Sequence, residues 1–324
     1  MSSVGDWEFP LSAQPKPEDY DYDLDRALSA VVGLHAIIPA DAFTADTLGT
    51  ERGGNGVFIG DGVVLTIGYL ITEAESVWLT LANGRSIEGT VLGYDQETGF
   101  GLVQALARVD VAPLPLGNSA AISVGDTVVV AGAGGRRHSL AARVIARQEY
   151  TGYWEYMLDE AFFTAPSHPN WGGTAMIDAA GELVGLGSLQ LQQATQSGSA
   201  ENLNMMVPTD LLKPILNDLM TLGRPNHPPR PWLGFYASEV DDTVVIVGLS
   251  ARGPAYKADL KSGDVVLAVG GSEVDSLSTL FRRIWALGHA GVTVPLTISR
   301  DGRVFEVHVA SMDRNRLLKG PTLQ

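Results

Sequence analysis

Short apolar runs separated by glycine-containing turns dominate the chain from about residue 28 to residue 205. Residues 56–66 hold two such runs around Gly60-Asp61-Gly62, and residues 76–91 hold two more around Asn83-Gly84. An Asn-Gly pair between apolar runs is a strong hairpin signal, because both residues adopt positive φ with little cost. Many short strands at this spacing favour a β-sandwich or a β-barrel.

The pattern changes after Pro208, where apolar residues recur at helical spacing and Gly223 is expected to end the helix. These apolar positions are Leu211, Leu212, Ile215, Leu216, Leu219 and Met220. Residues 224–231 contain four prolines, which indicates a stiff, extended linker. We therefore expect an acidic, solvated tail over residues 1–27, a β domain over 28–223, the linker, a second domain over 232–312 and a frayed tail over 313–324.

Composition narrows the class of partner. The formal net charge is −15, from 22 basic and 37 acidic residues. Nucleic acids and anionic membrane surfaces are poor partners for such a chain, because both are bound through basic patches. The absence of cysteine excludes disulfides, thiolate metal sites and a cysteine nucleophile. The six histidines show no metal-ligand spacing, so we expect neither a metal nor a cofactor.

Hydropathy gives no sign of a membrane segment. The most apolar early stretch, residues 27–40, contains polar residues and is shorter than the roughly 20 residues that a spanning helix needs. The first residues lack the basic start and apolar run of a signal peptide. We therefore expect no membrane span and a cytoplasmic location.

Four segments of the β region occur in the order of known motifs: residues 54–59, 64–71, 95–103 and 170–185. They resemble the G-S-G-x-x-[IV], V-[LV]-T-N-x-H-V-[VI], D-x-x-[ST]-D-[IL]-A-[LV]-[IVL] and G-N-S-G-G…G-E-[LV]-[IV]-G motifs of HtrA/DegP trypsin-like serine proteases. The resemblance implies a trypsin-like double β-barrel.

The same resemblance places three catalytic positions, and all three have lost the expected residue. Tyr69 stands at the position of the histidine base, Gly99 at that of the orienting aspartate and Trp171 at that of the serine nucleophile. A phenol with a pKa near ~10 cannot act as a base near pH 7. Glycine cannot orient a base, and an indole has no nucleophilic hydroxyl.

Other features near these positions leave alternatives. Gly172 and Gly173 remain in place, and they either keep a turn needed for folding or keep a cleft that still accepts an extended peptide. A Gly-Asn-Ser string outside the aligned motif ends at Ser119, but alanines follow it, so we do not expect a nucleophile there. His168 is interpreted as an exposed loop residue.

The second domain resembles a PDZ domain. Residues 232–235 resemble the carboxylate-binding loop, and residues 251–266 resemble the segment that follows, with Asp259 where glycine is usual. In PDZ domains the backbone N–H groups of this loop hold the terminal carboxylate of a peptide. The resemblance therefore implies a mainly β chain with a small α+β PDZ domain after the barrels. It implies a peptide site at Trp232, Leu233, Gly234, Phe235, Leu280 and Phe281.

Two functions remain open at this point. The first is a catalytically inactive HtrA-like protein that acts as a peptide- or protein-binding scaffold subunit through its PDZ domain and its degenerate protease cleft. The partner would be a protein or peptide, engaged through a C-terminal carboxylate. The second is an HtrA/DegP-type serine endopeptidase of protein quality control that uses unrecognised catalytic residues. Homo-oligomerisation is left open.

Overall fold

The computed structural model describes residues 7–194, 200–241 and 243–320, and the chain divides into two compact units. The first unit comprises residues 1–148, 160–226 and 319–324, and the second comprises residues 149–159 and 227–318. One division therefore falls inside the proline-rich stretch. The other assigns residues 149–159 to the second unit, although they lie within the sequence of the first.

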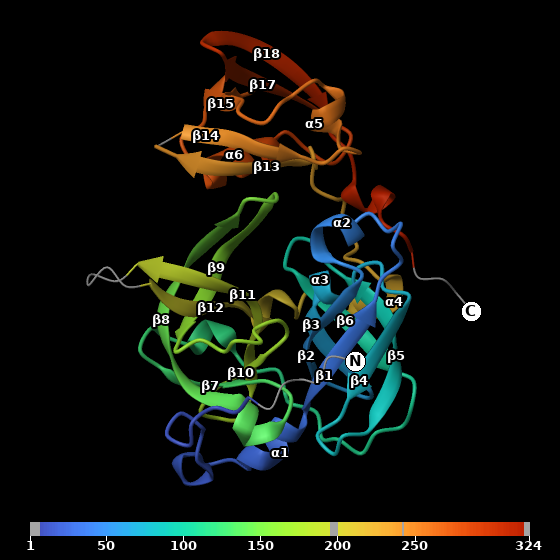
Figure 1. The fold of residues 1–324 in the computed structure, drawn as a ribbon, viewed down its shortest axis with the longest axis vertical. Coiled ribbons are helices and arrows are strands. Elements are labelled where there is room, and N and C mark those ends of the chain that lie inside the picture. The colour runs from blue at the N-terminus through green and yellow to red at the C-terminus, as the bar shows by residue number, and fades with distance from the viewer. Residues whose placement is uncertain (1–6, 195–199, 242, 321–324) are drawn as a thin grey trace. The chain divides into compact units, whose positions relative to one another are not determined.

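The first unit contains two closed β-barrels of six strands each (Figure 1). The first barrel has the strand order β1-β2-β3-β6-β5-β4, and each neighbouring pair is antiparallel. Its strands are β1 (Val31–Ile37), β2 (Glu51–Phe58), β3 (Val63–Ile67), β4 (Ser76–Thr80), β5 (Ser86–Tyr94) and β6 (Phe100–Ala105). Both predicted hairpins are confirmed as the pairs β2–β3 and β4–β5.

The second barrel has the order β10-β11-β12-β9-β8-β7. Its strands are β7 (Thr127–Ala131), β8 (Ser139–Gly152), β9 (Tyr156–Ala165), β10 (Ala175–Ile177), β11 (Leu183–Ala194) and β12 (Ala200–Pro208). Its core is formed by apolar residues that alternate along the strands, such as Val128 and Val130 of β7, which are at most 1% exposed. The connection between β8 and β9 lies in residues 149–159, the segment assigned to the second unit.

Short helices complete the first unit. They are α1 (Leu24–Ser29), α2 (Ala45–Leu48), α3 (Gly68–Ile71), α4 (Leu216–Leu222) and the 3-10 turns η1 (Pro17–Asp19), η2 (Ser119–Ala121), η3 (Gly135–His138) and η4 (Thr209–Leu211). The predicted helix end is confirmed, because Gly223 closes α4 with a left-handed φ of 73°. The predicted single helix is split, with η4 preceding α4.

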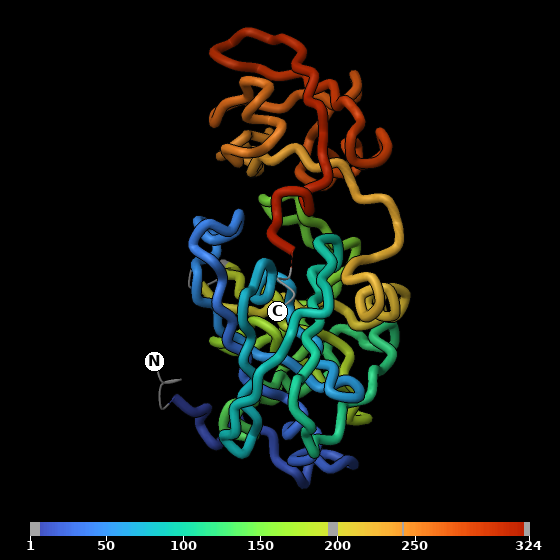
Figure 2. The backbone as a smooth tube through the Cα atoms, turned by 90° about the vertical axis from the view of Figure 1, so that its right-hand side faces the viewer, coloured from blue at the N-terminus to red at the C-terminus, as the bar shows by residue number. Residues whose placement is uncertain are grey.

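The start of the chain is more ordered than a solvated tail. Figure 2 shows its described residues, in dark blue, at one end of the first unit. The N–H of Phe9 donates to the carbonyl of Arg137 at 2.9 Å, and the ring of Trp7 meets that of His168 with centroids 5.4 Å apart. The acidic composition suggested solvation, but burial of these aromatic rings on the second barrel outweighs it. Residues 1–6 lie outside the described residues.

The second unit is built on a six-stranded sheet, with β13-β14-β15-β17-β18 in order and β16 paired to β15. Its elements are β13 (Phe235–Val240), β14 (Thr243–Leu249), α5 (Pro254–Lys257), β15 (Val265–Val269), β16 (Ser272–Glu273), α6 (Leu277–Ala286), β17 (Thr293–Arg300), β18 (Arg303–Ala310) and the 3-10 turn η5 (Arg314–Leu317). Apolar residues of α6 pack into the core of this sheet. The predicted frayed end over residues 313–324 thus contains η5, and residues 321–324 lie outside the described residues.

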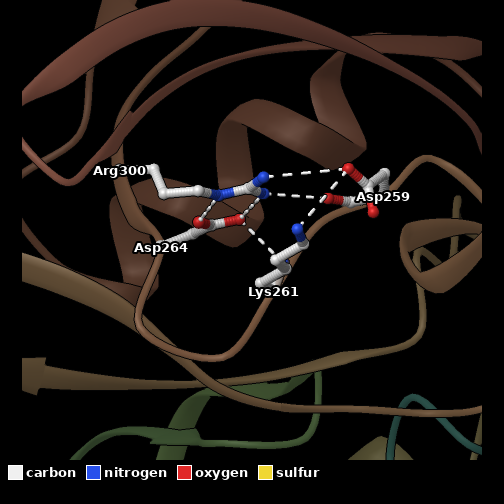
Figure 3. A network of polar contacts seen from close by, with 4 residues as sticks. All are labelled: Asp259, Lys261, Asp264 and Arg300. Carbon is white, nitrogen blue, oxygen red and sulfur yellow. Dashed lines mark hydrogen bonds and ion pairs between the residues drawn. The ribbon is translucent and has the colours of Figure 1, made fainter.

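Asp259 shows how the second unit accommodates an unusual residue. Its φ of 59° lies in the left-handed region, where the resemblance expects glycine. Arg300 holds this turn, since its guanidinium donates to the Asp259 carbonyl at 2.8 Å and to both carboxylate oxygens of Asp264 at 2.6 and 2.7 Å (Figure 3). The network explains how the turn tolerates a side chain.

Candidate functional site

Tyr69, at the position expected for the base, is partly buried in α3. Its Oη donates a hydrogen bond to the carbonyl of Ser188 in β11, at 2.9 Å. Burial raises the pKa of this phenol above its usual value, and a hydrogen bond with the Trp171 side chain opposes the rise. The phenol therefore stays protonated at neutral pH and cannot take a proton from a nucleophile.

Trp171, at the position expected for the nucleophile, meets Tyr69 from the second barrel. Its carbonyl accepts hydrogen bonds from the N–H and the hydroxyl of Thr174, at 3.1 and 2.9 Å, which closes the loop that carries it. The only polar atom of an indole is a donor, so the indole N–H donates to the Tyr69 phenol. The expected base and nucleophile are thus replaced by a hydrogen-bonded pair with no basic or nucleophilic atom.

Gly99 lies beside this pair through its backbone. Its carbonyl accepts a hydrogen bond of 2.6 Å from the N–H of Gly68, the residue before Tyr69. Its φ of 85° is one that residues with a side chain rarely adopt. The structure therefore brings the three predicted positions together, and the backbone at the third suits glycine better than aspartate.

Pro169 is a further departure that the sequence reasoning missed. In trypsin-like proteases the oxyanion is bound by two backbone N–H groups, those of the nucleophile and of the residue two positions before it. Two positions before Trp171 stands Pro169, which has no N–H. The signal was available, because the G-N-S-G-G motif has glycine at that place. This loop therefore lacks one donor that would stabilise a tetrahedral intermediate.

Asn55 of β2 joins the first barrel to the same loop. Its Nδ2 donates to the carbonyls of Asn170 and Gly172 at 2.8 and 3.1 Å, and its Oδ1 accepts from the N–H of Ala133 at 2.9 Å. Gly173 has a φ of 75°, and a Cβ there would overlap the carbonyl oxygen of Asn55. Packing between the barrels is thus sufficient to explain the retained glycine at 173.

A second site lies in the loop that opens the second unit. The N–H groups of Leu233, Gly234 and Phe235 donate to the carboxylate of Glu155 at 3.0, 2.7 and 3.3 Å. The φ of 78° at Gly234 lets three successive N–H groups turn toward one anion. Burial raises the pKa of Glu155 to about 7, although these N–H groups and Arg314 act to lower it. The loop thus holds a carboxylate that belongs to residues 149–159.

Comparison with known proteins finds a family match in each of two parts of the chain. Residues 54–186 match the trypsin-like peptidase domain, and residues 231–310 match the PDZ domain. The serine endoprotease DegS of Haemophilus influenzae is 28% identical over 271 residues, which cover 82% of this chain and 78% of that protein. The serine protease Do-like HtrA of Lactobacillus helveticus is 25% identical over 277 residues, which cover 77% of this chain and 65% of that protein. The chain carries an HtrA-type trypsin-like domain followed by one PDZ domain.

Solved structures of HtrA-type proteins share this fold. The protease AlgW with a decapeptide has a TM-score of 0.54 and 19% identity, with 92% of this chain and 98% of that chain covered. The serine endoprotease from Yersinia pestis has a TM-score of 0.52 and 21% identity, with 90% and 98% covered. The predicted fold class, a mainly β chain with a trypsin-like domain followed by a PDZ domain, is confirmed.

His168 is not the exposed loop residue that we expected in the trypsin-like domain. It is 1% exposed, and its Nδ1 accepts a hydrogen bond of 3.1 Å from the N–H of Asn170. Its Nε2 then carries the proton and donates to the carbonyl of His138 at 2.9 Å. Burial lowers the pKa of His168 to about 4, so the ring is neutral at pH 7 and its acceptor nitrogen is already used.

The side chains predicted for the PDZ peptide site lie mostly in the core. Leu280 and Phe281 of α6 are 0% exposed, as is Leu233, and Phe235 is 1% exposed. Trp232 is 9% exposed. The backbone of the loop, rather than these side chains, faces the carboxylate, and a contact of Leu280 or Phe281 with a ligand stays a prediction.

Two further properties bear on the site. Among the residues that the structure describes, no group of three or more His, Asp and Glu side chains is placed to hold a metal ion. Within those same residues, no helix combines the length and apolar character needed to cross a membrane.

Proposed function

We propose that this chain is a catalytically inactive HtrA-like protein that binds peptides or proteins through its PDZ domain and the remains of its protease cleft. The observation that carries the proposal is the hydrogen-bonded pair of Tyr69 and Trp171, which stands where a base and a nucleophile would be needed. Gly99 supplies no orienting carboxylate, and Pro169 supplies no oxyanion donor. Each departure alone would impair acyl transfer.

The PDZ loop supports binding as the remaining activity. Three N–H groups of residues 233–235 converge on one carboxylate, which is the geometry that captures a peptide C-terminus. The loop binds the anion through backbone N–H groups, and the charge of Arg314 also favours the ionised carboxylate. AlgW has been solved with a decapeptide and with a tripeptide, and this fold likeness supports a peptide as the class of ligand.

Ser119 is the alternative nucleophile that the sequence offered, and its surroundings do not favour it. It is 2% exposed, and its Oγ accepts a hydrogen bond of 3.0 Å from the N–H of Asp210. The Ser119 hydroxyl also hydrogen-bonds the Asp210 carboxylate. A nucleophilic serine needs a neighbouring general base that takes up its proton near neutral pH, and a carboxylate is too weak a base for this. The role of Ser119 is to tie η2 to η4.

The test of inactivity uses the full chain with denatured casein and a set of fluorogenic peptides. A serine-directed fluorophosphonate probe is applied in parallel. We expect no turnover and no labelling, and Ser119→Ala should behave as the parent chain does. Turnover that survives repurification and disappears on substitution of a single serine or threonine would show that the chain is a protease.

The test of binding titrates the full chain with a labelled pool of eight-residue peptides, randomised at their last four positions and bearing a free C-terminus. An amidated pool of the same peptides is the control. We expect binding of the free-carboxylate pool, of micromolar strength or about −8 kcal/mol, and weaker binding of the amides. Equal binding of both pools would exclude the carboxylate loop as the site.

A further inference from the structure

The carboxylate in the PDZ loop comes from the chain itself. The N–H groups of Gly234 and Phe235 donate to Oε1 of Glu155, at 2.7 and 3.3 Å, and the N–H of Leu233 is shared by its two carboxylate oxygens. A peptide C-terminus would use the same donors, because a free carboxylate also offers two oxygens to successive N–H groups. Glu155 therefore occupies the place that the proposed ligand needs.

The neighbouring backbone imitates a peptide as well. The carbonyl of Tyr153 accepts a hydrogen bond of 2.9 Å from the N–H of Ala237 in β13. β13 is one of the two edge strands of the sheet, and an extended peptide is added at such an edge. The ring of Tyr153 lies near that of Tyr236, with centroids 5.9 Å apart. Residues 153–155 thus make both kinds of contact expected of a bound peptide.

Ion pairs hold this segment at its two ends. Arg282 of α6 pairs with Glu149 at 2.6 Å and with Asp159 at 2.7 Å, the first and last residues of the 149–159 segment. All three side chains keep access to solvent, so the pairs are weak and reversible. Such an attachment suits a segment that is docked but can leave.

The backbone at Glu155 is strained. Its φ of 59° lies in the left-handed region, which is unfavourable for a residue with a side chain unless the surroundings hold it there. Glycine would relieve the strain, but it could not supply the carboxylate that the loop binds. The hydrogen bonds of the Glu155 carboxylate with the loop therefore offset the cost of its strained backbone.

We infer that residues 149–159 are an internal ligand of the PDZ loop, so that docking of Glu155 and binding of a peptide carboxylate exclude one another. The inference rests on the proposed function of the loop as a peptide site, and it adds how that site is regulated. A peptide binds only when the segment has left, so its apparent affinity is reduced by the fraction of molecules whose loop is free.

The experiment compares the full chain with Glu155→Gln, Glu155→Gly and the control Glu273→Gln, which removes a charge from an exposed position of the same domain. Each variant is titrated with the labelled free-carboxylate pool and its amidated twin. We expect both Glu155 variants to bind the free-carboxylate pool about tenfold or more tightly than the parent, as for a loop that is free in one molecule in ten or fewer. Glu273→Gln should match the parent.

Hydrogen exchange on the unmodified chain gives a second measurement that needs no variant. Saturating free-carboxylate peptide should speed exchange over residues 149–159 while residues 233–237 stay protected. Equal affinity of the parent and both Glu155 variants, or unchanged exchange over 149–159 in the bound state, would overturn the internal ligand and leave the peptide site standing. Failure of every variant to bind either pool would overturn the proposed function, and the inference with it.

Discussion

Rebuilding the triad alone should not make this chain a protease. The perturbation is the triple variant Tyr69→His, Gly99→Asp and Trp171→Ser, to be compared with a quadruple variant that adds Pro169→Gly. Pro169 is exposed, so its replacement removes no core contact, but it returns one backbone N–H to the loop. Loss of one oxyanion donor costs about 10²- to 10³-fold in kcat, or about 3–4 kcal/mol. We expect the quadruple variant to exceed the triple variant by that factor in kcat/KM.

The assay follows hydrolysis of a fluorogenic peptide, with circular dichroism to confirm folding, because an aspartate at the φ of 85° found at Gly99 costs roughly 1 kcal/mol. Pro169→Ala in place of Pro169→Gly separates the two effects of the change, since alanine restores the N–H without the freedom of glycine. The quadruple background with Trp171→Ala in place of Trp171→Ser is the inactive control. Equal rates for the triple and quadruple variants would refute the reasoning about Pro169.

Three other outcomes follow from the described contacts. Asn55→Ala should lower the free energy of unfolding in urea by about 2–3 kcal/mol, because the carbonyl of Asn170 loses its donor and the N–H of Ala133 loses its acceptor. Asn55→Asp should lower it more, since a carboxylate would face the carbonyls of Asn170 and Gly172, and an alanine variant as stable as the parent would contradict this. His168 has its pKa lowered to about 4 by burial, so the unfolded state takes up the proton first; stability is full above pH 6.5 and is lost as the pH falls toward 4. Between pH 7 and pH 5 we expect the parent to lose about 2 kcal/mol more than His168→Gln does, since other groups titrate alike in both, and equal changes in the two proteins would assign the effect elsewhere. Asp259→Gly should raise the melting temperature or leave it unchanged, with a gain of up to about 1 kcal/mol from relief of its φ of 59°, and a marked fall would show that its ion pairs matter more than the strain.

The sequence was sufficient for the barrels and for the hairpins within them. Asn83-Gly84 and Gly60-Asp61-Gly62 fixed where strands turn back, because these turns depend on local backbone freedom that the residues themselves carry. It was less sufficient at the start of the chain. There, the acidic residues suggested a solvated tail, but the rings of Trp7 and Phe9 pack on the second barrel. This contact joins distant parts of the chain, so no local sequence pattern predicts it.

The candidate site divides in the same way. Tyr69, Gly99 and Trp171 could be placed from motif order, and Pro169 could have been read from the same motif. The contact between Glu155 and the loop could not be predicted, because it joins residues 78 to 80 positions apart in sequence and depends on how the β8–β9 connection is directed. The burial of His168 likewise depends on rings contributed by a distant part of the chain.

The discontinuous make-up of the second unit bears on how its binding strength is measured. A fragment that starts at Trp232, the boundary that the sequence suggests, would leave out residues 149–159 and with them the Glu155 carboxylate. The N–H groups of residues 233–235 would then face solvent and would be free to donate hydrogen bonds to a bound anion. Such a fragment would report an intrinsic affinity, whereas the whole protein would report that affinity reduced by the share of molecules whose loop is already filled. The ratio of the two affinities would give the fraction of molecules whose loop is free, and hence the fraction in which Glu155 occupies the loop.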